Sequence, residues 1–133
     1  MDDIVQFMDH DGLANRYDHV VMAGAALGAL GVPAPGRIQV YPHWQTTFLD
    51  HLDAAVSLHG IEDVYIIEHR DCGAYSKLIN KTFGTSFEEQ RRELRAHRRH
   101  ARLLGRLIGA RKATIKVRAF LMDLRGDVEL LDW

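Results

Sequence analysis

The stretch Val64-Tyr-Ile-Ile-Glu-His-Arg-Asp-Cys-Gly-Ala-Tyr75 decides the fold expected for this chain. It opens with an apolar run without clean alternation, which is typical of a parallel strand covered on both faces. Polar residues and a glycine follow at once, and residues 74–80 then carry the pattern of a short helix. The stretch therefore predicts a strand that switches to a helix, with chemically useful side chains at the carboxyl edge of a sheet.

Other short apolar runs predict further strands on either side of this stretch. They are Ile4–Met8, His19–Ala23 and Ala113–Met122. The last run alternates, so one of its faces is expected to meet solvent. A glycine-containing turn and a short apolar segment follow it, and together they predict a β-hairpin at residues 116–131.

Helical patterns separate the predicted strands. Apolar residues recur with a 3.6-residue period from Trp44 to Val56, and Gly60 stands where a C-cap glycine belongs. The longest pattern runs from Phe87 to Ile108. Alternating strands and helices predict an α/β fold, with a central, mostly parallel β-sheet flanked by helices. Because the chain has 133 residues and no long linker, we expect a single domain over residues 1–133.

The overall composition is that of an ordinary globular protein. Hydrophobic residues make up 47% and charged residues 26%, and the net charge of −1 favours neither nucleic acid nor membrane. A single cysteine, Cys72, excludes an internal disulfide and a four-cysteine zinc site, and it fits a reducing compartment. With no long apolar span and no signal-peptide pattern, we expect a cytoplasmic protein without membrane contact.

The charge is unevenly distributed along the chain. Between Glu88 and Lys112 nine basic residues face three acidic ones, which leaves a net charge of −7 on the rest. The default interpretation is a solvated helix face whose other side packs through leucines. The alternatives are an anion-binding patch or a contact with the acidic part of a second subunit. Nucleic acid is disfavoured because no aromatic residue lies among the arginines.

His69 and Cys72 are the candidate metal ligands. They lie three residues apart at the predicted switch from strand to helix, so both side chains can leave the same sheet edge. Imidazole and thiolate are the ligand types that zinc prefers, and the start of the following helix favours the thiolate. The alternative is that Cys72 is only a small apolar filler of the interior.

The chain resembles the β-class carbonic anhydrases from Phe48 to Tyr75. The resemblance rests on Leu52-Asp-Ala-Ala-Val-Ser-Leu-His-Gly-Ile61, Asp63-Val-Tyr-Ile-Ile67 and His69-Arg-Asp-Cys-Gly-Ala74, with a weaker match over Asp18–Ala25. It implies a carbonic anhydrase-like sheet, Zn²⁺ held by His69 and Cys72, and reversible hydration of carbon dioxide to bicarbonate by zinc-bound hydroxide. It also implies a homodimer or a higher homo-oligomer.

The sequence also departs from the pattern of that family. Aligned on the first predicted strand, Asp9 matches the family's aspartate, which is a zinc ligand or orients the bound water. Phe7 stands at the position of a zinc-binding cysteine, and Asp11 stands at the position of an arginine. Glu68 and Arg70 replace a glycine and a small hydroxyl residue of the same family. The expected site is therefore His69, Cys72 and Asp9, and the alternative is a catalytically inactive binding or assembly subunit.

Overall fold

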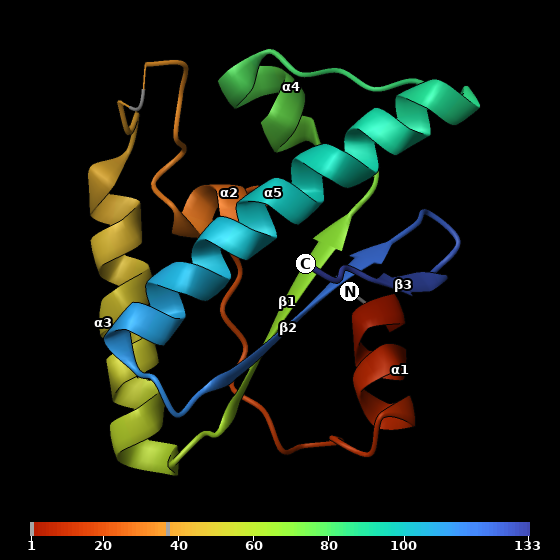
Figure 1. Ribbon diagram of the computed structural model, residues 1–133. Helices are drawn as coiled ribbons and strands as arrows, with labels where there is room; N and C mark the ends of the chain where they lie inside the picture. Colours follow the sequence, from red (N-terminus) through yellow and green to blue (C-terminus); the bar gives the residue numbers. More distant parts are fainter. Residues whose placement is uncertain (1, 37) are drawn as a thin grey trace.

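A computed structural model describes residues 2–36 and 38–133, and it is a mixed α/β structure (Figure 1). In this part of the chain five helices accompany a three-stranded sheet. The helices are α1 (Asp2–His10), α2 (Ala26–Ala29), α3 (Pro42–His59), α4 (Gly73–Ile79) and α5 (Phe87–Arg111). The strands are β1 (Asp63–His69), β2 (Lys116–Met122) and β3 (Val128–Leu130). None of these helices is long and apolar enough to cross a membrane.

The sheet is mixed rather than mostly parallel, with the strand order β1-β2-β3. β1 and β2 pair in parallel, in a register that runs from Asp63 opposite Lys116 to His69 opposite Met122. Helices α4 and α5 form the crossover between these two strands, as parallel pairing requires. β2 and β3 pair antiparallel, from Phe120 opposite Leu130 to Met122 opposite Val128.

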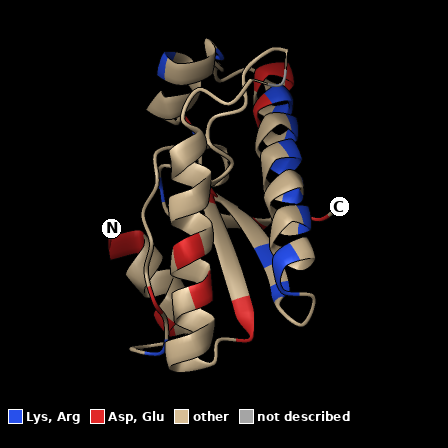
Figure 2. Ribbon diagram, turned by 90° about the vertical axis from the view of Figure 1, so that its left-hand side faces the viewer, with Lys and Arg blue, Asp and Glu red and all other residues tan. Residues whose placement is uncertain are grey.

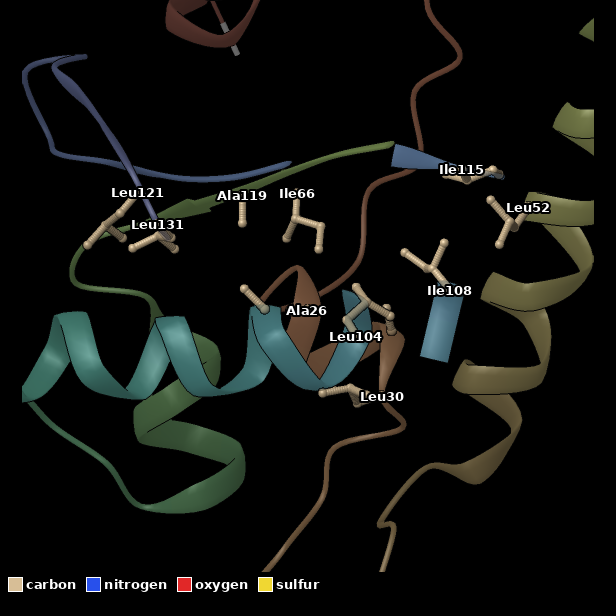
Figure 3. Packing of buried hydrophobic residues seen from close by; sticks show 12 residues of the cluster. Ala26, Leu30, Leu52, Ile66, Leu104, Ile108, Ile115, Ala119, Leu121 and Leu131 are labelled. Carbon is tan, nitrogen blue, oxygen red and sulfur yellow. The ribbon is translucent and has the colours of Figure 1, made fainter. Parts of the chain in front are cut away.

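The main core lies between one face of the sheet and helices α2, α3 and α5. Figure 3 shows Ile66 and Ala119 pointing from the sheet toward Ala26 and Leu104, which lie on α2 and α5. Each of these four side chains is at most 4% exposed. Full burial of one aliphatic side chain of this size contributes about 1.5–3 kcal/mol. The core therefore holds α5 against the sheet, where the helix runs roughly along β1 and β2, as Figure 1 shows.

The predicted helices from residue 42 onward are confirmed. Proline occupies the first turn of α3, and Gly60 ends that helix in the left-handed conformation that the sequence predicts for a C-cap. α5 begins with a capping box, in which Ser86 and Glu89 each satisfy a backbone N–H of the other. Local signals were sufficient here because each helix carries its own start, stop and apolar face.

The prediction of a strand at Ile4–Met8 is wrong, because these residues lie within helix α1. Two aspartates lie in its first turn, where their negative charges interact favourably with the positive end of the helix dipole and stabilise the helix. Ile4, Phe7 and Met8 share one face at the spacing i, i+3, i+4. The Phe7 ring packs edge-on against Phe120 of β2 with ring centroids 5.0 Å apart, so α1 covers the sheet face opposite α5.

The prediction of a buried strand at His19–Ala23 is also wrong. The segment belongs to no strand, and Val20 and Val21 are 46% and 72% exposed. Among the described residues, no backbone group from position 17 to 21 finds a backbone hydrogen-bond partner. An apolar run becomes a strand only when its backbone groups pair with a neighbouring strand, and residues 19–23 pair with none of the three described strands.

Candidate functional site

His69 and Cys72 meet at the carboxyl end of β1, as the sequence predicts. His69 is the last residue of β1, and Cys72 immediately precedes α4. The His69 imidazole and the Cys72 sulfur interact, and the backbone N–H groups of Ala74 and Tyr75 act on the same sulfur. His69 is exposed, whereas Cys72 is 9% exposed. The pair therefore lies where the protein interior opens to solvent.

The electrostatics of this pair favour charge separation. Burial opposes ionisation of Cys72, but the hydrogen bonds from His69 and from the start of α4 outweigh it and lower the pKa of the thiol. The same hydrogen bond to Cys72 raises the pKa of His69 to about 9, against the opposing effect of burial. The arrangement favours ionisation of the thiol beside a protonated imidazole, and such a pair is suited to ligate a metal ion or to act as a nucleophile.

A second contact orients the imidazole of His69. Its Nδ1 lies 2.9 Å from the carbonyl oxygen of Arg70. Because a carbonyl can only accept, Nδ1 carries the proton and Nε2 is the lone-pair nitrogen of the neutral ring. Metal-binding histidines in proteins are commonly oriented in this way.

The turn between His69 and Cys72 is held by a buried carboxylate on α5. Asp71 has a left-handed φ of 53°, a conformation that aspartate tolerates better than most residues. Its N–H donates to Oε1 of Glu93 at 2.6 Å, and Nη1 of Arg70 donates to Oε2 of the same carboxylate at 3.0 Å. Glu93 is 3% exposed. The Glu93 carboxylate therefore holds the turn through Asp71 and Arg70.

Glu68 ties the end of β1 to two helices. Its side chain is 1% exposed, and Oε1 accepts the N–H of Ala26 at 3.0 Å, at the start of α2. Oε2 accepts from Nδ1 of His97 at 2.8 Å, and His97 is fully buried. Nε2 of His97 has no hydrogen-bond partner among the described residues. Glu68 thus anchors the end of β1, which carries His69, to helices α2 and α5.

Tyr75 and His100 form another buried polar contact beside the pair. The Tyr75 hydroxyl shares a hydrogen bond with Nδ1 of His100 at 2.8 Å, and the Tyr75 ring centroid lies 4.4 Å from that of His97. Burial lowers the pKa of His100 to about 4, and nearby Lys81 and Arg99 act in the same direction. His100 is therefore neutral at pH 7.

Asp9 is not brought to the pair by this structure. It is an exposed residue near the end of α1. Within residues 2–36 and 38–133, no group of three His, Cys, Asp or Glu side chains is arranged to hold a metal ion. Phe7 packs on Phe120 and Asp11 accepts the Tyr65 hydroxyl at 2.7 Å, so neither occupies a vacated ligand position. A ligand or water-orienting role for Asp9 stays a prediction.

The sequence reasoning missed the buried polar residues around the pair. Glu93, His97 and His100 are all buried on α5, on the same face as Leu104 and Ile108. They are spaced by four and three residues, and Leu104 follows four residues after His100, so the three continue the apolar stripe of that helix. These polar residues occupy positions of the apolar helix face, and this could have been read from the sequence. Polar residues at such positions are buried, and buried polar groups need hydrogen-bond partners.

Comparison with known proteins shows homologues over almost the whole chain. An uncharacterized protein of Rickettsia bellii is 30% identical over 129 residues, which cover 97% of this chain and 73% of that protein. The chain belongs to the same family as this protein. An uncharacterized protein of Rickettsia conorii is 29% identical over 129 residues, which cover 97% of this chain and 64% of the relative. No family model and no solved structure matches the chain.

Proposed function

We propose that this protein is a carbonic anhydrase-like zinc protein that interconverts carbon dioxide and bicarbonate, and that His69 and Cys72 are its zinc ligands. The observation that carries the proposal is the contact between the two side chains at the carboxyl end of β1. The sequence around them, His69-Arg-Asp-Cys-Gly-Ala74, supports it through its resemblance to the β-class enzymes. A carbonic anhydrase-like sheet and a homodimer belong to the same proposal.

The donors present fit zinc in kind but are too few to complete a site. Catalytic zinc takes three protein ligands and keeps one position open. The described residues bring together one imidazole and one thiol, with no third donor arranged beside them. The proposal therefore requires a third donor from outside this arrangement, namely Asp9 after a movement of α1.

The residues of this chain have defined tasks in that proposal. Zinc would supply Lewis acidity that lowers the pKa of a bound water. Cys72 provides a thiolate that its backbone hydrogen bonds already favour, and His69 provides Nε2 because Arg70 O holds Nδ1–H. Glu93 and Glu68 position the two ligands by holding the turn and the strand.

The second candidate is a catalytically inactive carbonic anhydrase-like subunit that acts in binding or assembly. The specific observation in its favour is that two donors meet but a third does not. The two candidates differ in whether a bound metal is accompanied by turnover.

Cobalt binding tests the ligand assignment. We expect about one equivalent of Co²⁺ or Zn²⁺ per untagged chain, with a thiolate-to-cobalt charge-transfer band. Cys72→Ser should abolish the band, and His69→Ala should weaken binding. His51→Ala is the matched control, because His51 is an exposed histidine on α3. An unchanged band in His69→Ala would remove that residue from the site.

Stopped-flow hydration of carbon dioxide tests the activity. The zinc-loaded chain should hydrate carbon dioxide above the uncatalysed rate, and Cys72→Ser should lose that activity. Zinc binding without any rate above background would favour the inactive subunit. Absence of stoichiometric zinc in the unaltered chain would reject both the ligand assignment and the activity.

A further inference from the structure

Arginine side chains form a row along the solvent-facing side of α5. The members of this row are all exposed and follow one another after three or four residues, which places them on one face of the helix; they are Arg91, Arg95, Arg99, Arg102 and Arg106. Figure 2 shows these basic residues along the helix. Because a helix rises 1.5 Å per residue, the arginine row is about 22 Å long and carries about one positive charge per turn.

The arginine row has no acidic neighbour on its own helix that could neutralise it. Glu93 is the only acidic residue between positions 90 and 111, and it is 3% exposed and bound to the turn before α4. Within residues 2–36 and 38–133, none of the five arginines takes part in an ion pair. The rest of the chain is acidic overall, so the attraction for an anionic partner is concentrated on α5.

Two exposed aromatic side chains lie beside the arginine row. Phe87 is 73% exposed at the start of α5, and the guanidinium carbon of Arg91 lies 5.6 Å from the centre of its ring. Trp133 is 49% exposed, and its ring lies against α5 at Gly105, where an added Cβ would be 3.1 Å from the ring. Aromatic residues therefore flank the arginines on the surface of the protein, although none lies among them in the sequence.

The two aromatic side chains lie along the same side of the helix. Phe87, Arg91, Arg98, Arg102 and Gly105 are separated by four, seven, four and three residues, so they form one stripe along α5. Arg98, in the middle of the stripe, is half-buried, and its Nε atom is buried without a hydrogen-bond partner among the described residues. The stripe from residue 87 to 105 is about 27 Å long, with an aromatic ring near each end and arginines between them.

We propose that the arginine row, together with Phe87 and Trp133, binds single-stranded nucleic acid. Guanidinium groups suit phosphate geometry, and exposed aromatic rings stack on bases of any sequence. At about 3.4 Å per stacked nucleotide, the stripe accommodates up to about eight nucleotides. An acidic protein surface would match the charge as well, but it offers the two rings no bases on which to stack. The proposal does not depend on the zinc site.

Fluorescence anisotropy of a labelled oligothymidine of about twelve nucleotides tests the binding. The oligonucleotide should bind at low salt, and the logarithm of the association constant should fall with the logarithm of the salt concentration. If about four arginines contact phosphates, the slope should be about −3. A duplex of the same length should bind more weakly, because its bases are already stacked and cannot reach the rings.

A matched pair of variants assigns the phosphate contacts. Arg95→Gln combined with Arg102→Gln should weaken binding by at least about tenfold and should reduce the salt slope by about 1.4. Glutamine keeps the helix propensity of these positions, so the variant should fold as the unaltered chain does. Arg16→Gln is the control, because Arg16 is an exposed arginine between α1 and α2. Equal losses in the two proteins would place the oligonucleotide elsewhere.

Trp133 reports the stacking directly. The chain has two tryptophans, so Trp44→Phe leaves Trp133 as the only one, and its fluorescence should be quenched when the oligonucleotide binds. Trp133→Leu keeps an apolar side chain against Gly105 but removes the ring. It should weaken the single strand by at least about fivefold and leave the affinity for the duplex unchanged.

Three outcomes would overturn the proposal. The first is the absence of oligonucleotide binding at low salt. The second is equal affinity for the single strand and the duplex with no effect of Trp133→Leu, which would mean that only charge is recognised. The third is a mass in light scattering that rises with protein concentration at low salt and is lost in the double arginine variant, without oligonucleotide binding, which would assign the row to a second copy. None of these readouts uses zinc or activity, so failure here is distinct from failure of the proposed function.

Discussion

The paired and the open edge of β1 lie in contrasting surroundings. Beside β2, the backbone ladder is continuous, and beneath it Ile66 and Ala119 pack on α5. Beyond the open edge, residues 19–23 have no ladder partner among the described residues, and all of them except the partly buried Met22 are exposed. The apolar run in β1 thus forms a strand, whereas the similar run His19–Ala23 does not. The contrast shows that an apolar run forms a strand only where its backbone groups actually pair with those of a neighbouring strand.

The largest expected effect contrasts a core side chain with an exposed one. Leu104 is 2% exposed on α5, so Leu104→Ala should lower the free energy of unfolding by about 2–5 kcal/mol. Val21 is 72% exposed, so Val21→Ala should change it by less than about 0.5 kcal/mol. Urea denaturation measures both. Equal losses would show that residues 19–23 are already packed in the isolated chain.

The next effect comes from His100 on the packed side of the sheet. Its pKa in the fold is about 4, below the ordinary 6.5, because burial and the charges of Lys81, Arg99 and His97 disfavour its protonation. The unfolded chain therefore takes up the proton first as the pH falls. The associated stability is complete above pH 6.5 and is lost between pH 6.5 and 4, up to about 3 kcal/mol.

His100→Gln tests this pH dependence. Glutamine removes the titrating group but keeps a side chain that can hydrogen-bond the Tyr75 hydroxyl, as donor or as acceptor. Urea denaturation at pH 7 and at pH 4.5 should show a smaller loss on acidification in the variant than in the unaltered chain. The same loss in both proteins would assign the acid sensitivity to other groups.

A smaller effect is expected at the start of α5. The Ser86 hydroxyl accepts the Glu89 N–H, and the Glu89 carboxylate accepts the Ser86 N–H at 3.2 Å. Ser86→Ala should therefore lower the free energy of unfolding by about 1 kcal/mol. Ser57→Ala on α3 is the matched control, because Ser57 is exposed and makes no cap. A loss of the same size in both variants would show that the cap contributes nothing specific.

The smallest effect concerns the sheet face that α1 covers. The Tyr65 hydroxyl donates to Oδ2 of Asp11 at 2.7 Å, on an exposed part of the surface. Tyr65→Phe should cost only about 0.5–1 kcal/mol, because solvent competes for this hydrogen bond. Thermal denaturation together with the exchange of α1 amides measures the change. A loss of several kcal/mol would mean that α1 is held mainly by this contact.

The charge pattern of α5 was partly readable from the sequence. Figure 2 shows Lys and Arg running along α5, while Asp and Glu lie on α3 and elsewhere. Arg91, Arg95, Arg102 and Arg106 are exposed, as the default interpretation of a solvated face predicts. Arg111 donates to Asp53 on α3, at distances of 3.3 and 2.5 Å. The sequence could not show this pairing, because it joins residues far apart in the chain.

The sequence by itself determined the elements whose signals are local. Helices α3 and α5 carry their own caps and apolar stripes, β1 and β2 carry apolar runs, and the spacing of His69 and Cys72 across the switch from strand to helix brings those two side chains together. Only the tertiary structure decided the fate of the N-terminal runs and the partners of Glu68 and Glu93. Strand pairing and buried hydrogen bonds depend on residues distant in the chain. An apolar run such as His19–Ala23 therefore does not determine whether a strand forms, because its neighbour must supply half of the hydrogen bonds.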